Sequence, residues 1–313
     1  LDEEYQSYKE QKSPFEKLIR QDVKRTLRNI DLYSEEDGAG QQALFNVLKA
    51  YSLHDTEVGY CQGLSYVVGP LLLNMSEVEA FRVLVKLMDN YKLRGYFTPS
   101  MENLRQTLYQ FERLFGEQLP LLFNHFRSQN ITSTMYASQW FMTLFACRLP
   151  IELVTRVYDV VIAEGIESLL RFALTLLRRS QTHLMTLGFD EIIKFLNSES
   201  LFDYYTARNP NEFVQDAARV TSVSVQRLRR LAEEYHRVNQ SGLDDERYLD
   251  VLNEKNRVLE RENSHLLAKL QDLSLEHSDL TSQLVQVRKE HEELAGLVQE
   301  LRKQLLIERE EAK

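Results

Sequence analysis

Two short polar segments contain the residue types best suited to chemistry. The first runs from Ile19 to Arg25 and has the pattern IxxDxxR. Residues three apart share a helix face, so Asp22 could hold the Arg25 guanidinium in a charge-assisted pair. An ordinary surface pair, contributing about a few tenths of a kcal/mol, is an equally open alternative. Three more basic residues lie in or just after this segment, Arg20, Lys24 and Arg28. They would suit an anionic partner, although a solvated surface is the default interpretation.

The second segment is Tyr60-Cys61-Gln62-Gly63, which follows Gly59 and precedes an apolar run ending at Gly69-Pro70. A polar Gln62 in this place indicates a turn of the backbone. Spacing alone favours a structural role, in which the Gln62 side chain caps the helix that follows.

Other familiar chemical groupings are missing from the sequence. The seven histidines form no HExxH pattern, and no GxSxG elbow, P-loop or dinucleotide glycine motif is present. The two cysteines, Cys61 and Cys147, fit a reducing compartment and no metal site. A net charge of −9 excludes a general positive field for nucleic acid. We therefore expect no metal, no cofactor and no nucleic-acid partner.

The elements that must position the two segments are predicted to be helices. Residues 1–243 contain no alternating strand pattern and several apolar stripes at helical spacing, which predicts an all-α domain of roughly a dozen helices. The clearest stripes are Leu44–Tyr51, Phe81–Met88 after the Ser76 start signal, Leu153–Val160 between Pro150 and Gly165, and Leu169–Leu177.

Residues 244–310 are predicted to form one long coiled-coil helix. Every seventh residue from Leu252 to Leu301 is apolar, and Asn256 and Asn263 fall at the facing seam position. This pattern favours a parallel homodimer through residues 249–305. A single helix lying on its own domain, or a different helical partner, remains an alternative.

The motifs resemble those of TBC-domain GTPase-activating proteins for Rab GTPases. IxxDxxR at 19–25 and YxQG at 60–63 match the two signature motifs of that family, in family order. Met135–Phe141 and Asp159–Gly165 resemble two further conserved stretches, so the resemblance runs from about residue 15 to about residue 238. It implies a TBC domain at 1–240, in the branch where a coiled coil follows.

One departure concerns the beginning of the domain. The family opens with an RGxxW segment, whereas the only tryptophan here is Trp140. We therefore expect a fragment that lacks the first helices.

The resemblance implies a mechanism in which Arg25 and Gln62 act in trans on a GTP-bound Rab. The arginine neutralises developing charge and the glutamine positions the attacking water, while the partner carries Mg and GTP. The chain would have no independent reaction of its own. Supporting or GTPase-contact roles would fall to Asp22, Ile19, Tyr60, Gly63 and Trp140, with core packing favoured for Trp140.

The resemblance also bears on context and on the competing function. It implies regulation of vesicle trafficking by a cytoplasmic protein recruited peripherally to Golgi, endosomal or exocytic membranes, with membrane contact only through Rab. A non-catalytic Rab-binding scaffold or tether is the alternative. Retention of both Arg25 and Gln62 argues against it.

The heptad pattern yields a direct prediction. A peptide of residues 244–313 is expected to be helical and dimeric, and replacing Leu266 and Leu273 by Asp should dissociate it, because charge then enters two seam positions. Sedimentation equilibrium measures the mass of both peptides. A monomeric unaltered peptide would contradict the prediction.

Overall fold

The computed structural model describes residues 1–241 and Gly296. The predicted coiled coil at 244–310 therefore lies outside the described residues, apart from Gly296. Leu1–Val238 forms one compact unit. The domain predicted from the sequence spans residues 1–240.

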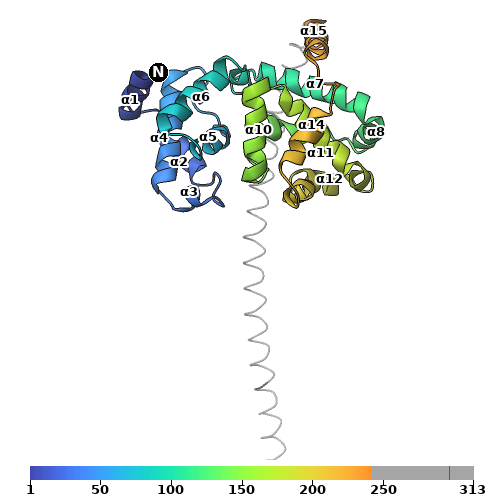
Figure 1. Cartoon of the computed structure of the whole chain (residues 1–313), viewed down its shortest axis with the longest axis horizontal. Coiled ribbons are helices and arrows are strands. Elements are labelled where there is room, and N and C mark those ends of the chain that lie inside the picture. The colour runs from blue at the N-terminus through green and yellow to red at the C-terminus, as the bar shows by residue number, and fades with distance from the viewer. Residues whose placement is uncertain (242–295, 297–313) are drawn as a thin grey trace, which may run out of the picture. The chain divides into compact units, whose positions relative to one another are not determined.

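All the regular secondary structure in residues 1–241 is helical and none of it is a strand, which confirms the all-α prediction (Figure 1). The described chain has more helices than the dozen expected, because several are a single turn long and carry no periodic stripe. The α-helices are α1 Asp2–Glu10, α2 Glu16–Val23, α3 Asp31–Ser34, α4 Ala39–His54, α5 Leu64–Leu72, α6 Glu77–Asp89, α7 Glu102–Gln118, α8 Pro120–Ser128, α9 Ala137–Met142, α10 Ile151–Glu164, α11 Ser168–Leu184, α12 Phe189–Leu196, α13 Asp203–Thr206, α14 Asn211–Ala218 and α15 Val225–Ser241. Three 3₁₀ helices join them: η1 Leu93–Tyr96, η2 Ser133–Met135 and η3 Glu199–Leu201.

The helices expected from apolar stripes are present as α4, α6, α10 and α11. Ser76 forms a capping box with Glu79 at the start of α6, as its start signal indicates. Pro150 is the N-cap of α10, and Gly165 ends that helix with a φ of +104°. These ends come from local chemistry, so sequence could predict them.

Helix α4 is the centre of the part of the fold that carries both polar segments. It packs against α1, α2, α3, α5 and α6, and most of its residues are buried. Because α2 and α5 lie against the same helix, the chain brings residues 16–23 and 64–72 together (Figure 1).

Aromatic side chains fill the core around α7 and α9. Trp140 is fully buried, and its ring packs against Tyr136 and Phe145 at centroid distances of 5.0 and 5.6 Å. A partner protein cannot touch this side chain. The Trp140 side chain therefore packs in the core, which is the role that the sequence favoured.

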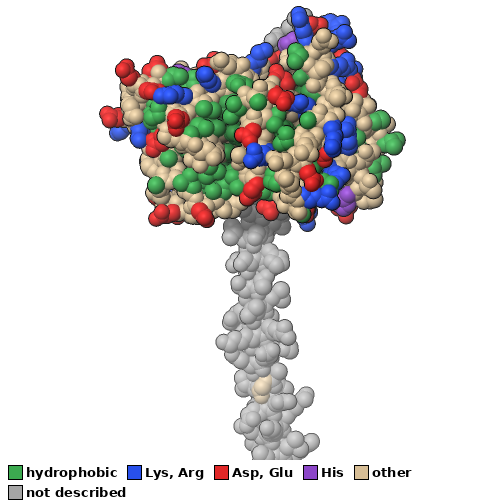
Figure 2. Space-filling model, in the orientation of Figure 1, with side chains coloured by type: hydrophobic (Ala, Val, Ile, Leu, Met, Phe, Trp, Pro, Cys, Tyr) green, Lys and Arg blue, Asp and Glu red, His purple; other side chains and the backbone are tan. Residues whose placement is uncertain are grey.

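The face of the described residues that Figure 2 shows carries acidic and basic side chains in mixture. No helix among residues 1–241 is long and apolar enough to cross a bilayer. Within the same residues, no group of three or more His, Cys, Asp or Glu could hold a metal ion.

Candidate functional site

The two polar segments meet at one carboxylate, that of Asp22 at the end of α2. Its Oδ1 accepts one hydrogen bond from Nε of Arg25 and forms an ion pair with a terminal guanidinium nitrogen of the same residue, both at 2.8 Å. Arg25 does not continue the helix as expected, because α2 ends at Val23 and Arg25 lies in the following turn. The predicted pair forms nonetheless, through a turn in which the Arg25 N–H donates to the Asp22 carbonyl.

The second oxygen of Asp22 binds the other polar segment. Oδ2 accepts from the Tyr60 hydroxyl at 2.5 Å, the Ser65 hydroxyl at 3.1 Å and the Gly63 backbone N–H at 3.2 Å. Burial and the neighbouring carboxylate raise the pKa of Tyr60 well above its usual range, so its hydroxyl keeps the proton that it donates.

Burial separates this arrangement from a surface ion pair. The Asp22 side chain is 4% exposed, whereas the Arg25 side chain is 57% exposed. A buried charge needs several hydrogen-bond partners, and the Asp22 carboxylate has three donors besides Arg25, all from residues 60–65. The surface-pair alternative is therefore wrong. Asp22 positions Arg25 and leaves more than half of the Arg25 side chain accessible.

The turn that carries Arg25 is held in a strained conformation. Leu27 has a φ of +52°, a region that costs a branched side chain about 1–3 kcal/mol. Its side chain packs so closely on Gly69 of α5 that a Cβ at Gly69 would lie 2.6 Å from Leu27 Cδ1. Thr26 reinforces the turn, since its hydroxyl lies 2.7 Å from the Asp22 carbonyl and 2.8 Å from Ser65 Oγ.

Gln62 projects from the loop that Asp22 holds. Gly63, the N-cap of α5, has a φ of +103°, which only glycine adopts readily. The Gln62 side chain is exposed and makes no hydrogen bond to another described residue, and no side chain caps α5. The capping interpretation of Gln62 is therefore wrong, and its amide is open to a partner.

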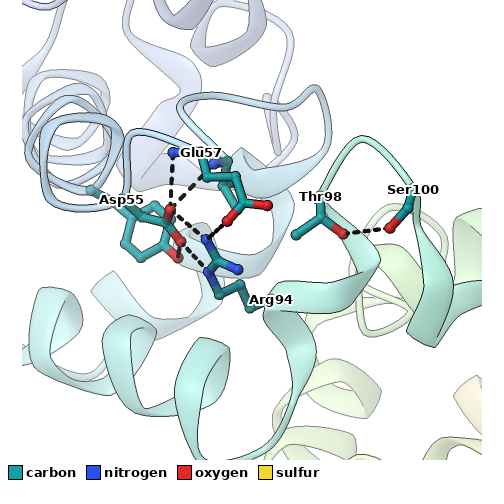
Figure 3. A network of polar contacts seen from close by, with 7 residues as sticks. Asp55, Glu57, Arg94, Thr98 and Ser100 are labelled. Atoms are coloured by element: carbon teal, nitrogen blue, oxygen red, sulfur yellow. Dashed lines mark hydrogen bonds and ion pairs between the residues drawn. The ribbon is translucent and has the colours of Figure 1, made fainter.

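The approach to this loop is fixed by a second carboxylate, Asp55, at the end of α4. Arg94 of η1 binds both Asp55 oxygens, at 2.6 and 3.0 Å, and reaches Glu57 at 2.6 Å, as Figure 3 shows. The backbone N–H groups of Glu57 and Val58 also donate to Asp55. Burial raises the pKa of Asp55, but the Arg94 and Val58 hydrogen bonds outweigh it and leave the pKa lowered.

The other predicted site residues divide into buried and exposed groups. Ile19 and Tyr60 are buried at 0% and 6% exposure, so they form the scaffold of the site. The expected positive face is partly neutralised, because Lys24 pairs with Glu36 at 2.6 Å. Arg20 stacks on the Phe45 ring at 4.0 Å and keeps its charge.

Sequence reasoning missed three side chains that shape the site. Ser65 is the one polar residue between two apolar neighbours after Gly63, and that isolation was a usable signal. Asp55 and Arg94 gave no signal, because their pairing depends on the approach of η1 to the end of α4.

Comparison with known proteins identifies the family of this chain. The family model of the RabGAP TBC domain matches residues 41–238. The human ecotropic viral integration site 5 protein homolog is 39% identical over 261 residues, covering 83% of this chain and 32% of the relative. The Eremothecium gossypii GTPase-activating protein GYP5 is also 39% identical, over 82% of this chain and 35% of its own length. The chain thus spans about a third of these relatives.

Solved structures show the same fold. The Chlamydomonas flagellar RabGAP TBC domain superposes with a TM-score of 0.57 at 27% identity, covering 68% of this chain and 69% of that one. The Ypt/Rab-GAP domain of Gyp1p gives a TM-score of 0.61 at 20% identity over 69% and 78%. The chain belongs to the RabGAP TBC family.

The role of Asp22 can be tested by its amide. Asp22→Asn replaces one acceptor oxygen by a donor and removes the charge, so we expect a loss of about 2–4 kcal/mol in unfolding free energy by urea titration. Asp216→Asn is the matched control, because Asp216 binds Arg219 and Tyr205 but is 28% exposed. We expect the control to lose less than about 1 kcal/mol. Equal losses would contradict the buried-junction role.

Proposed function

We propose that this chain accelerates GTP hydrolysis by a Rab GTPase, supplying Arg25 and Gln62 to the partner's active site. The observation that carries the proposal is the Asp22 carboxylate, which binds Arg25 through one oxygen and the residue after Gln62 through the other. Two exposed groups of complementary chemistry therefore share one buried anchor.

Arg25 suits the stabilisation of a transferring phosphoryl group. A guanidinium has five N–H donors, and Asp22 engages only Nε and one terminal nitrogen. The remaining donors can meet the oxygens on which charge develops. Because the ion pair with Asp22 already orients the side chain, little ordering is left for the moment of reaction.

Gln62 suits the orientation of water. Its amide has both a donor and an acceptor, as a group that positions an attacking water needs. The loop is fixed on both sides of it, by Tyr60 and Gly63 on Asp22. We propose that this amide replaces the water-positioning glutamine of the Rab.

The competing function is a scaffold that binds Rab without stimulating hydrolysis. A scaffold would have no need of an oriented, exposed arginine beside an exposed glutamine. We favour the activator for that reason.

The cellular setting that we propose is vesicle trafficking. The Caenorhabditis elegans relative named Rab GTPase-activating protein eat-17 is 35% identical over 86% of this chain. By analogy, we propose a GTP-bound Rab as partner and peripheral recruitment from the cytoplasm to Rab-bearing membranes. The heptads at 249–305 support a homodimer.

The arginine proposal is tested by substitution. Arg25→Ala should lower stimulated hydrolysis by about 10³-fold or more, and Arg25→Lys should recover little, because an ammonium lacks the planar fork. Arg219→Ala is the matched control, since Arg219 also pairs with an aspartate three residues earlier. Single-turnover phosphate release, with the Rab that responds best in a panel, measures all three. A rate above about a tenth of the unaltered one for either Arg25 variant would refute the assignment.

The glutamine proposal needs an altered Rab. If Gln62 positions the water, a Rab whose own switch glutamine is changed to Leu should still be stimulated, and Gln62→Ala should abolish stimulation of both Rabs. Single-turnover rates at saturating activator decide this, with circular dichroism and Rab affinity as checks on folding and binding. A folded, Rab-binding Gln62→Ala variant with a near-normal rate would leave Arg25 as the only group supplied in trans.

A further inference from the structure

Arg148 is an arginine whose charge no described carboxylate balances. It lies in the turn between α9 and α10 and is only partly exposed. Nε and one terminal nitrogen donate to Gln139 Oε1 at 3.2 and 2.7 Å. The terminal nitrogens also donate to the Asn197 carbonyl at 2.9 Å and to Asn197 Oδ1 at 3.3 Å. All four acceptor contacts are neutral, so the guanidinium is held in place with its full positive charge.

The turn that carries Arg148 lies directly behind the glutamine loop. A Cβ at Gly63 would lie 3.7 Å from Thr143 Cγ2, which is ordinary contact. The Thr143 hydroxyl donates to the Gln139 carbonyl at 2.7 Å, so the residue that holds Arg148 is joined to the residue that touches Gly63. Leu144 and Phe145, at φ of +48° and +65°, are fully buried and fix the turn.

Arg25 and Arg148 both act electrostatically on the hydroxyl of Tyr66. Burial raises the pKa of Tyr66 on α5, and Cys147 and Asp22 raise it further, while Arg25 and Arg148 both lower it. The two guanidinium groups therefore lie within charge range of the same hydroxyl. Together with the contact of Thr143 on Gly63 and the Thr143–Gln139 hydrogen bond, this puts the Arg148 turn beside the glutamine loop.

The exposed groups of this pair are hydrogen-bond donors. A guanidinium only donates, so the Gln139 oxygen must face it and the amide nitrogen must face away. That nitrogen has no acceptor among the described residues, and it lies beside a guanidinium whose charge no described carboxylate balances. A group with two acceptor oxygens and negative charge complements such a surface.

We propose that Arg148, positioned by Gln139 and Asn197, binds an Asp or Glu carboxylate on the surface of the GTPase and helps to select it. This inference rests on the proposed function, since it names a contact of the same site. The contact adds affinity and association rate, and takes no part in the phosphoryl transfer.

The choice of a carboxylate over the nucleotide phosphate follows from mobility. Arg25 is 57% exposed and has one anchor, so it can enter a partner's cleft. Arg148 is bound to two neighbours through four hydrogen bonds, and leaving them would cost those bonds. It can meet only a group that the partner brings to this surface.

The test compares Arg148→Met, which keeps length and removes charge, with Arg148→Lys, which keeps charge. With the best-responding Rab, Arg148→Met should raise KM about tenfold, equivalent to about 1.4 kcal/mol of binding, while kcat stays unchanged. The rise of KM with salt should become shallower in Arg148→Met, and Arg148→Lys should retain the salt dependence and recover part of the affinity. Arg178→Met is the matched control, because Arg178 also donates to a glutamine, Gln118 at 3.2 Å.

The possible results separate this contact from the proposed function. An unchanged KM and salt dependence in folded Arg148→Met, with normal stimulation by the unaltered chain, would overturn the contact alone. A fall in kcat at constant KM would overturn it in favour of a phosphate contact. A fall only in unfolding temperature would show a structural role and overturn it. Failure of the unaltered chain to stimulate any Rab would overturn both proposals.

Discussion

A single buried charge, the Asp22 carboxylate, is the constraint on which the site depends. Removing a carboxylate from water is costly unless hydrogen bonds and an opposite charge replace the solvent. Here the replacements come from Arg25, from Tyr60 and Gly63 in the glutamine loop, and from Ser65 at the start of α5. Because the Asp22 carboxylate needs these hydrogen bonds, it fixes residues 19–25 against residues 60–65. The positions of the exposed Arg25 and Gln62 side chains follow from that contact.

The contacts of Asp22 also link the region that matches the family model to Arg25, which lies outside that region. The RabGAP TBC family model begins at residue 41, so it includes Gln62 and does not reach Arg25. The connection between the two comes from the contacts of Asp22, which lie on both sides of that boundary. Membership in the family and the local geometry are thus independent supports for the proposed activity.

Around the site the backbone is held rigidly, while the polar side chains are exposed. Glycine and left-handed turns hold the backbone at Gly63, Leu27, Leu144 and Phe145, while arginine and glutamine side chains extend from them. Strain of about 1–3 kcal/mol at a residue such as Leu27 persists only where packing over-determines it, and here Gly69 of α5 provides that packing. Preorganised donors of this kind suit the proposed role of completing a partner's active site.

The sequence by itself determined the helical class, the ends of α6 and α10, and the two motifs, because apolar spacing and capping residues act within a few positions of the chain. It also singled out Asp22, Arg25 and Gln62 by type. It could not decide whether Asp22 was buried, whether Gln62 capped a helix, or whether Trp140 was accessible. Whether each of these side chains is buried or exposed depends on how the helices pack. Helices α2 and α5 meet on α4, Arg94 binds Asp55, and the aromatic side chains form a core. Most of these contacts join residues far apart in sequence. Burial is a property of the packed fold, and it separated the scaffold from the residues left exposed to a partner.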